Sequence, residues 1–308
     1  MFELVVASGK GGTGKTSLVG ALAELARSVV LVDCDVDAAN LHLIVPHRVL
    51  EKHEFSSSRC ASIEVDKCVA CGLCLESCRF NAISMTPDAG TPWGMRFAVD
   101  PLACEGCGLC SRICPSQAVA FDKVVSGEWF RSHSAFGPFL HARLGIAKSN
   151  SGRLVSQLRQ QAREIAAADR YNLILVDGPP GIGCPVIASL TNASYLLIVT
   201  EPSLSAVHDM ERLADLATHF SIKTGICINR CDTNVDISRR IEQLATARGL
   251  TVHGQIPYDP AFTQAQLKGQ SYLRVASEEG IERIRRIWQS VLSDAGYQDH
   301  ADTHRFAV

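Results

Sequence analysis

Residues 9–16 read Gly9-Lys10-Gly11-Gly12-Thr13-Gly14-Lys15-Thr16 and fill every fixed position of the phosphate-binding pattern G-x-x-x-x-G-K-[ST]. The glycines allow successive backbone N–H groups to face an anion, Lys15 supplies a positive charge for the outer phosphates, and the Thr16 hydroxyl is a magnesium ligand. An apolar strand pattern over 3–7 precedes the loop, and apolar residues at helical spacing over 16–27 follow it. We therefore expect a P-loop between a strand and a helix N-terminus, with Gly9 to Ser17 around the phosphates.

Lys10 places a second lysine inside this loop, and the resulting K-G-G-T-G-K-T resembles the deviant P-loop ATPases of the MinD, ParA and Mrp group. The resemblance implies an ATPase that uses ATP and Mg²⁺, works as a homodimer with ATP at the interface, and is slow without a partner. It also implies that Lys10 reaches the nucleotide bound by the other subunit. The alternative is a glycine-rich turn without a ligand, which the matching strand and helix patterns on either side disfavour.

An acidic segment follows the second apolar stretch. Residues 29–32 are typical of a strand buried in a parallel sheet, and Asp33-Cys34-Asp35 ends it. In the resembled family this position is the first switch, which implies that Asp35 orients the attacking water and contributes to the magnesium site, supported by Asp33 and Asn40. The alternative is that these residues merely cap the next helix, because N-caps prefer the same residue types.

A third apolar strand, over 173–176, ends in Asp177-Gly178-Pro179-Pro180-Gly181. This resembles the Walker B and second-switch segment of the same family. The resemblance implies that Asp177 holds magnesium together with Thr16 and Asp35. It also implies that Gly178 lies close enough to the γ-phosphate to move when that phosphate leaves.

Two later segments resemble the parts of the family that hold the base. Asn229-Arg230 ends a predicted strand where the adenine-reading asparagine lies, and Pro257 begins a segment similar to the loop that closes over adenine. The resemblance assigns Asn229, Arg230 and Pro257 to ATP binding. An asparagine that only forms a turn at a strand end is the alternative for Asn229.

The chain contains thirteen cysteines, and eight of them form an internal repeat. The run Cys68-x2-Cys71-x2-Cys74-x3-Cys78 recurs thirty-six residues later as Cys104-x2-Cys107-x2-Cys110-x3-Cys114-Pro115. The spacing is that of bacterial two-cluster ferredoxins, in which the fourth cysteine of each run ligates the other cluster.

This spacing predicts two [4Fe-4S] clusters with crossed ligands. The first cluster takes Cys68, Cys71, Cys74 and Cys114, and the second takes Cys78, Cys104, Cys107 and Cys110. Arg79 stands where a proline usually follows the fourth cysteine, which removes a backbone constraint but no ligand. Zinc bound by C-x2-C pairs is the alternative, although two sets of three cysteines with a crossed fourth suit two cubane clusters better.

Five cysteines lie outside the repeat, and two of them, Cys60 and Cys184, call for comment. We expect Cys60 to be an ordinary thiol. Cys184 follows the second switch at a spacing similar to that of a cluster-binding cysteine in the related nitrogenase iron protein. No suitable companion cysteine is present, so we expect Cys184 to be a buried structural thiol, and the alternative is redox chemistry at the axis of the dimer.

The order of elements predicts a doubly wound, mostly parallel α/β sheet with an inserted small α+β ferredoxin-like domain. We expect residues 1–60 and 123–295 to form the ATPase domain, 61–122 the insertion and 296–308 a polar tail. Residues 122–150 are interpreted as a return linkage that ends in a strand near 139–144. The last predicted helix, 281–292, has one apolar side, and we expect it to dock on the core rather than on a membrane.

Composition restricts the classes of partner. The 308 residues carry a net charge of -2, with 30 basic and 32 acidic side chains, so no nucleic-acid partner is expected. No run of 18 or more apolar residues occurs, and the chain starts without a basic segment before an apolar one. We expect a soluble cytoplasmic protein that does not bind membranes.

Three functions fit these patterns. In the favoured one, ATP binding and hydrolysis in the dimer gate electron transfer through the two clusters to a redox or metallocofactor-assembly protein. In the second, the chain is an iron-sulfur cluster carrier or scaffold that releases clusters under the control of ATP. In the third, it is a positioning ATPase similar to MinD or ParA, with structural clusters.

Overall fold

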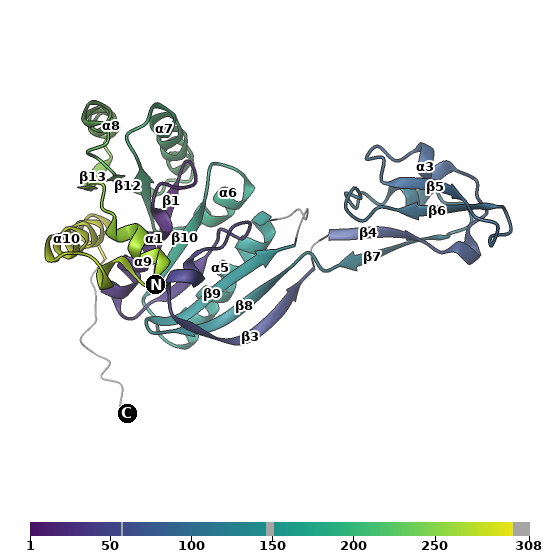
Figure 1. Cartoon of the computed structure of the whole chain (residues 1–308), viewed down its shortest axis with the longest axis horizontal. Helices are drawn as coiled ribbons and strands as arrows, with labels where there is room; N and C mark the ends of the chain where they lie inside the picture. The colour runs from purple at the N-terminus through teal and green to yellow at the C-terminus, as the bar shows by residue number, and fades with distance from the viewer. Residues whose placement is uncertain (57, 146–150, 298–308) are drawn as a thin grey trace. The chain divides into compact units, whose positions relative to one another are not determined.

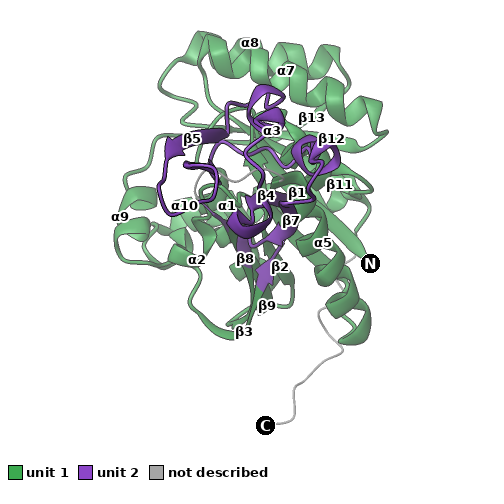
Figure 2. Cartoon of the chain, turned by 90° about the vertical axis from the view of Figure 1, so that its right-hand side faces the viewer, with its two compact units in different colours: residues 1–53, 129–143, 151–308 green, residues 54–128, 144–150 purple. Residues whose placement is uncertain are grey.

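The computed structural model describes residues 1–56, 58–145 and 151–297. It divides the chain into two compact units, shown in green and purple in Figure 2. Unit 1 comprises residues 1–53, 129–143 and 151 onward, and unit 2 comprises 54–128 with 144–150. All but the first two residues of the predicted polar tail lie outside the described residues.

Twenty-five elements follow one another within the described residues, and most of them are labelled in Figure 1. In unit 1 and at its margins they are β1 (Phe2–Ser8), α1 (Lys15–Ala26), β2 (Val30–Asp33), α2 (Leu41–Ile44), β3 (His47–Phe55), β8 (Gly127–Ser134), β9 (Gly137–Leu144), α5 (Ser151–Ala168), β10 (Leu173–Pro180), α6 (Cys184–Leu190), β11 (Tyr195–Thr200), α7 (Leu204–His219), β12 (Lys223–Asn229), α8 (Val235–Ala247), β13 (Thr251–Ile256), α9 (Ala261–Leu267), η2 (Tyr272–Arg274) and α10 (Glu278–Ala295). In unit 2 they are β4 (Ser58–Ile63), η1 (Val65–Lys67), α3 (Leu73–Glu76), β5 (Ile83–Pro87), β6 (Met95–Val99), α4 (Leu109–Ile113) and β7 (Val119–Val124).

A nine-stranded sheet forms the centre of unit 1, in the order β13-β12-β11-β1-β10-β2-β9-β8-β3. Each neighbouring pair of strands from β13 to β9 is parallel. Because β1 lies between β11 and β10, the carboxyl ends of the three central strands meet at one edge, where an open α/β sheet binds its ligand. The predicted mostly parallel α/β fold is confirmed.

Helices cover both faces of this sheet. Helices α1 and α10 pack on one face, against apolar side chains such as Leu4, Leu31 and Leu197. Helices α5, α6 and α7 contact the strands from the other face. In α10, Ile284, Ile287 and Trp288 belong to the core, so this helix docks on the sheet as its periodicity predicts. None of the helices in the described ranges has the length and hydrophobicity needed to cross a bilayer.

The strand predicted near 139–144 is confirmed as β9, but the segment before it is not a plain linkage, because β8 precedes β9 and the two form a β-hairpin. Strands β8 and β9 are separated by two residues and extend the main sheet beyond β2, and β3 adds a ninth strand at the edge. Trp129 is buried in β8 and stacks on His53 of β3, with 4.1 Å between ring centroids. The aromatic residues therefore have strand partners within the sheet, a packing that their local sequence pattern does not reveal.

Unit 2 contains two small antiparallel sheets, β4-β7 and β5-β6, and the short helices α3 and α4. Strands β4 and β7 pair from Ser58 with Val124 to Ile63 with Val119. This ladder explains why the unit begins at Glu54 and extends to Glu128, beyond the predicted insertion of 61–122.

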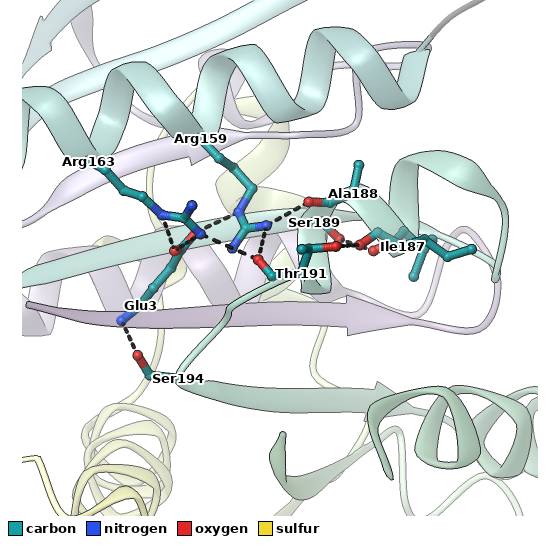
Figure 3. Close-up of polar contacts among 9 residues, drawn as sticks. Glu3, Arg159, Arg163, Ile187, Ala188, Ser189, Thr191 and Ser194 are labelled. Carbon is teal, nitrogen blue, oxygen red and sulfur yellow. Dashed lines mark hydrogen bonds and ion pairs between the residues drawn. The ribbon is translucent and has the colours of Figure 1, made fainter. Parts of the chain in front are cut away.

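A buried ionic network in unit 1 fixes β1 relative to helices α5 and α6 (Figure 3). Arg159 of α5 donates from Nε to Glu3 Oε1 at 2.6 Å and from Nη1 to the carbonyls of Ala188 and Thr191, at the end of α6. Arg163 binds the other oxygen of Glu3 at 2.7 Å. The Arg159 guanidinium therefore satisfies a buried carboxylate and carbonyls at a helix C-terminus together.

Arg159→Met is expected to lower the free energy of unfolding by about 3 kcal/mol, because it leaves Glu3 poorly paired in a buried site. Arg163→Met is the matched control, since Arg163 binds the same carboxylate from a position that is 32% exposed, and it should cost about 1 kcal/mol. Urea unfolding of both variants measures the difference. Equal losses would contradict the assignment of the main role to Arg159.

Three histidines pack together: His42 in α2, which follows the predicted first switch, His47 in β3 and His141 in β9. The rings of His42 and His141 stack at 5.6 Å, and His47 lies edge-on to His141 at 5.2 Å. Burial, followed by repulsion from His47 and His42, lowers the pKa of His141 to about 3. His141 therefore stays neutral in the folded protein at pH values where an unfolded chain would protonate it.

The free energy of unfolding should consequently fall as the pH drops below about 6.5, because the unfolded state then binds a proton that folded His141 rejects. The slope from this residue approaches about 1.4 kcal/mol per pH unit between about pH 6 and pH 4. His141→Phe removes the proton site, so the variant should show a shallower decline than the parent protein when urea unfolding is measured across this range. Parallel curves would refute the role of His141.

Candidate functional site

A cavity of about 730 Å³ lies at the carboxyl edge of the sheet in unit 1. Its lining includes ten predicted site residues: Gly11, Gly12, Thr13, Gly14, Lys15, Thr16, Ser17, Asp35, Asn229 and Arg230. Gly9, Lys10, Asp177, Gly178 and Pro257 do not line it. The P-loop, the first switch and the end of β12 thus surround one space large enough for a nucleotide.

Lys15 and Asp177 form a buried ion pair at the base of this cavity. Lys15 Nζ binds Asp177 Oδ1, and their side chains are 6% and 1% exposed. Burial alone would lower the pKa of Lys15, but attraction from Asp177, Asp33 and Asp35 raises it. Asp177 Oδ2 and Thr13 Oγ1 are buried without a hydrogen-bond partner among the described residues. The unpartnered Asp177 oxygen and the Thr16 hydroxyl are of the atom type that magnesium prefers as ligands, namely oxygen.

Asp33 shapes the backbone of the first switch. Its carboxylate accepts hydrogen bonds from the N–H groups of Asp35 at 3.1 Å and Leu41 at 3.0 Å. Burial and the charge of Asp177 raise the pKa of Asp33 to about 8 despite the opposing charge of Lys15. Burial also raises the pKa of Asp35, again against Lys15. Asp35 and Asn40 line the cavity and Asp33 does not, and their roles as main and supporting residues remain predictions.

Lys10 lies outside the cavity and is paired within its own chain. Its Nζ lies 2.6 Å from Glu201 Oε1 and 3.1 Å from Ser203 Oγ. Arg230 Nη1 binds the other oxygen of Glu201 at 3.1 Å. Glu201 was not identified from the sequence. Like Asp177, it is an acidic residue that directly follows an apolar strand run, here β11, and this pattern could have identified it.

Asn229 braces the P-loop. Its Nδ2 donates to the carbonyl of Thr13 at 2.8 Å, and its Oδ1 accepts from the N–H of Arg230. The side chain is thus engaged with protein groups at both ends, and a role in reading adenine remains a prediction. Next to Pro257, Tyr258 lines the cavity and is 58% exposed.

Helix α9 supplies further lining residues that sequence reasoning missed. Phe262, Thr263 and Gln266 reach the cavity, and Gln266 Nε2 donates to Ser17 Oγ at 2.8 Å. This helix has no motif of its own, so only the fold brings it to the P-loop.

Gly14→Ala is expected to destabilise the nucleotide-free protein by about 2 kcal/mol. Gly14 has a φ of 88°, and an added Cβ would lie 2.3 Å from Asn229 Nδ2, where it would displace the bond to Thr13. Gly11→Ala is the control, because its added Cβ would meet no atom within 4 Å, and a change within about 0.5 kcal/mol is expected. Thermal unfolding of both variants tests this, and equal midpoints would argue against the brace.

Unit 2 contains two hollows lined by cysteines. Hollow 1 is bordered by Cys68, Cys71, Cys74 and Cys114. Hollow 2 is bordered by Cys78, Cys104, Cys107 and Cys110, and Cys74 also reaches it. Each hollow thus gathers three cysteines of one run and the fourth cysteine of the other, together with apolar side chains such as Phe97 or Phe121.

The backbone around the two hollows is suited to sulfur ligands. The N–H of Ala82 donates to Cys78 Sγ at 3.4 Å, and the N–H of Ala118 donates to Cys114 Sγ at 3.3 Å. Across the described residues, no three His, Cys, Asp or Glu side chains are placed to hold a single metal ion. In a four-iron cluster each thiolate binds a different iron, so its ligands lie farther apart than those of a single ion. The donor set and the crossed grouping fit such a cluster.

The expectation of a buried Cys184 is wrong. Cys184 is exposed at the first position of α6. This seven-residue helix buries Val186, Ser189 and Leu190, and its first residue lies on another side. Cys60 is partly buried in β4.

Comparison with known proteins gives three findings. The family model described as CobQ/CobB/MinD/ParA nucleotide binding domain matches residues 4–272. The uncharacterized protein MJ0578 of Methanocaldococcus jannaschii is 32% identical over 237 residues, covering 76% of this chain and 80% of its own length. The uncharacterized protein MJ0579 of the same organism is 26% identical over 278 residues, covering 89% and 92%.

Among solved structures, the septum site-determining protein MinD of Pyrococcus horikoshii, complexed with Mg-ADP, has a TM-score of 0.57. It is 18% identical, and the match covers 96% of this chain and 97% of that one. At this identity the likeness shows a shared fold.

Proposed function

The chain belongs to the CobQ/CobB/MinD/ParA nucleotide-binding family, and we propose that it is an ATPase that couples its nucleotide state in a homodimer to electron transfer through two [4Fe-4S] clusters. The observation that carries this proposal is the pair of hollows in unit 2, each lined by one crossed set of four cysteines, in a chain that also has a P-loop cavity. Nucleotide and electron-transfer groups thus belong to one polypeptide.

In the nucleotide half, Gly9 to Ser17 would surround the phosphates, and Thr16, Asp35 and Asp177 would hold Mg²⁺. The orphaned Asp177 Oδ2 supports this assignment. Lys15 would move from Asp177 to the phosphates. This exchange costs little free energy, because the lysine ammonium has an anionic partner in both places. Gly178, Asn229, Arg230 and Pro257 complete the proposed ATP contacts.

Lys10 would serve the second subunit. In the single chain it is held by Glu201 and Ser203, so it must leave this pair before it can reach a nucleotide across a dimer interface. A charge-assisted contact to phosphate compensates for the lost ion pair. ATP binding would then promote both dimer formation and the release of Lys10 from Glu201.

In the second half, the two crossed sets of cysteines would hold the clusters, which supply one-electron transfer when bound. The chain runs directly from the first switch through α2 and β3 into unit 2. A switch that responds to the γ-phosphate is therefore covalently continuous with the cysteine-bearing unit. The recipient of the electron would be a redox or metallocofactor-assembly protein.

One observation favours a second candidate, an iron-sulfur cluster carrier or scaffold. Cys71 and Cys107 are exposed, and exposed ligands make a cluster accessible to an acceptor protein. The third candidate, a positioning ATPase similar to MinD or ParA, draws its support from the family and the fold. Retention of clusters in the presence of an apo-acceptor would distinguish the electron-transfer function from the carrier function.

The test is electron paramagnetic resonance of anaerobically reconstituted, reduced protein with and without Mg-ATP, in the parent chain and in Lys15→Ala. We expect about eight iron atoms per chain in both. Mg-ATP should change the spectrum or potential of the clusters only when Lys15 is present, because the variant lacks the charge that binds the outer phosphates. Spectra indifferent to nucleotide would refute coupling, and absence of bound iron would refute the cluster assignment.

A further inference from the structure

The two cysteine runs provide a matched pair within one chain. After the fourth cysteine they read Cys78-Arg79-Phe80-Asn81-Ala82 and Cys114-Pro115-Ser116-Gln117-Ala118. Asn81 and Gln117 both have positive φ, at 51° and 52°. Their N–H groups bond to the carbonyls of Cys78 and Cys114, at 3.3 and 3.2 Å. The backbone is therefore the same at both turns, and the side chains differ.

The residue two positions after the fourth cysteine, Phe80 in one turn and Ser116 in the other, differs in whether it can contact a cysteine sulfur. Ser116 Oγ lies 3.6 Å from Cys114 Sγ and belongs to the lining of hollow 1. At the equivalent position Phe80 lines hollow 2, is 44% exposed and has no hydroxyl group. The polar neighbours of Cys114 Sγ are the Ser116 hydroxyl and the backbone N–H groups of Ala118, Ser116 and Val119. For Cys78 Sγ the corresponding contact is the Ala82 N–H.

We infer that Ser116 makes the two clusters of the proposed function unequal, by raising the reduction potential of the one held by Cys68, Cys71, Cys74 and Cys114. A thiolate bound to iron can only accept, so the hydroxyl is the donor. Reduction adds negative charge to the cluster and its sulfurs, and a donor to sulfur stabilises the reduced state more than the oxidised one. Ser116 is a positioning and tuning residue, since its hydroxyl acts through a ligand.

Nearby charges do not offer an equally clear distinction. Glu105 borders hollow 2 and opposes added negative charge there. Arg59 lies over the ring of Phe121, which borders the same hollow, at 5.6 Å from the ring centroid and has the opposite effect. Arg79 and Pro115 also differ between the two turns, but of the side chains in the turns the Ser116 hydroxyl is the one in hydrogen-bond contact with a cysteine sulfur among the described residues.

The difference between the two reduction potentials gives electron transfer between the clusters a preferred direction. An electron given to either cluster at equilibrium resides mainly on the one beside Ser116. Cys74 borders both hollows, so the two sites are neighbours within unit 2. The path for electron transfer between the two clusters would therefore be short. Hollow 2 then serves as the entry or relay site, and hollow 1 retains the electron until the acceptor takes it.

The experiment is a redox titration of the reconstituted full chain with dithionite, one electron reducing one cluster, followed by electron paramagnetic resonance. The parent protein should show two midpoint potentials. Ser116→Ala should lower the higher one by about 59 mV, which corresponds to a tenfold change in the ratio of reduced to oxidised cluster. Ser116→Thr keeps the hydroxyl and should restore the parent value.

Ser77→Ala is the matched control. Ser77 also lines a hollow, and within the described residues its hydroxyl makes no hydrogen bond to a cysteine sulfur, so neither potential should move. If Ser116→Ala and Ser116→Thr both keep the parent potentials with iron bound, the inference is wrong while the proposed function stands. If the parent chain binds no iron-sulfur cluster, the proposed function fails and the inference fails with it.

Discussion

The buried pair between Lys15 and Asp177 is the interaction on which the site of unit 1 depends. It joins Lys15, in the P-loop segment that follows β1, to Asp177 within β10, and these two strands are neighbours in the sheet. Removing two charges from water is expensive, and attraction between them compensates only when geometry is good and the remaining polar atoms are satisfied. Here Asp177 Oδ2 is not satisfied among the described residues, so the pair is well placed but incomplete.

The charge balance explains how such a site can exchange partners. Three carboxylates, those of Asp33, Asp35 and Asp177, surround one lysine. Without a cation, burial and mutual repulsion raise the pKa of Asp33 to about 8, so this carboxyl group tends to hold a proton near neutral pH. A bound Mg²⁺ would relieve the same repulsion without a proton. Because Asp33 holds the backbone N–H groups of Asp35 and Leu41, the charge state of the site bears directly on the first switch.

Sequence patterns predicted the parts whose chemistry is local. The P-loop, the acidic strand ends and the grouping of cysteines follow from fixed spacings, because a tight loop leaves few arrangements for its side chains. Edge strand β3 was missed, since its sequence is mostly polar and does not alternate between apolar and polar residues. Glu201 and Gln266 were missed for another reason: their partners, Lys10 and Ser17, lie far away in the chain, and only sheet order brings them together.

The distinction between local constraints and contacts with distant parts of the chain also explains why the duplicated cysteine runs are not identical. The residue two positions after the first cysteine has positive φ in both runs, at 53° for Ala70 and 68° for Gly106. A non-glycine residue in this region costs about 1 kcal/mol, which Ala70 tolerates. Gly106 has less freedom, because an added Cβ would lie 2.3 Å from the carbonyl oxygen of Arg59 in β4. The repeated spacing therefore determines the backbone of each cysteine run. The strand packed beside a run determines where its residues must differ from those of the other run. Side chains that contact the cysteine sulfurs are not constrained in this way, and differences between them can serve function.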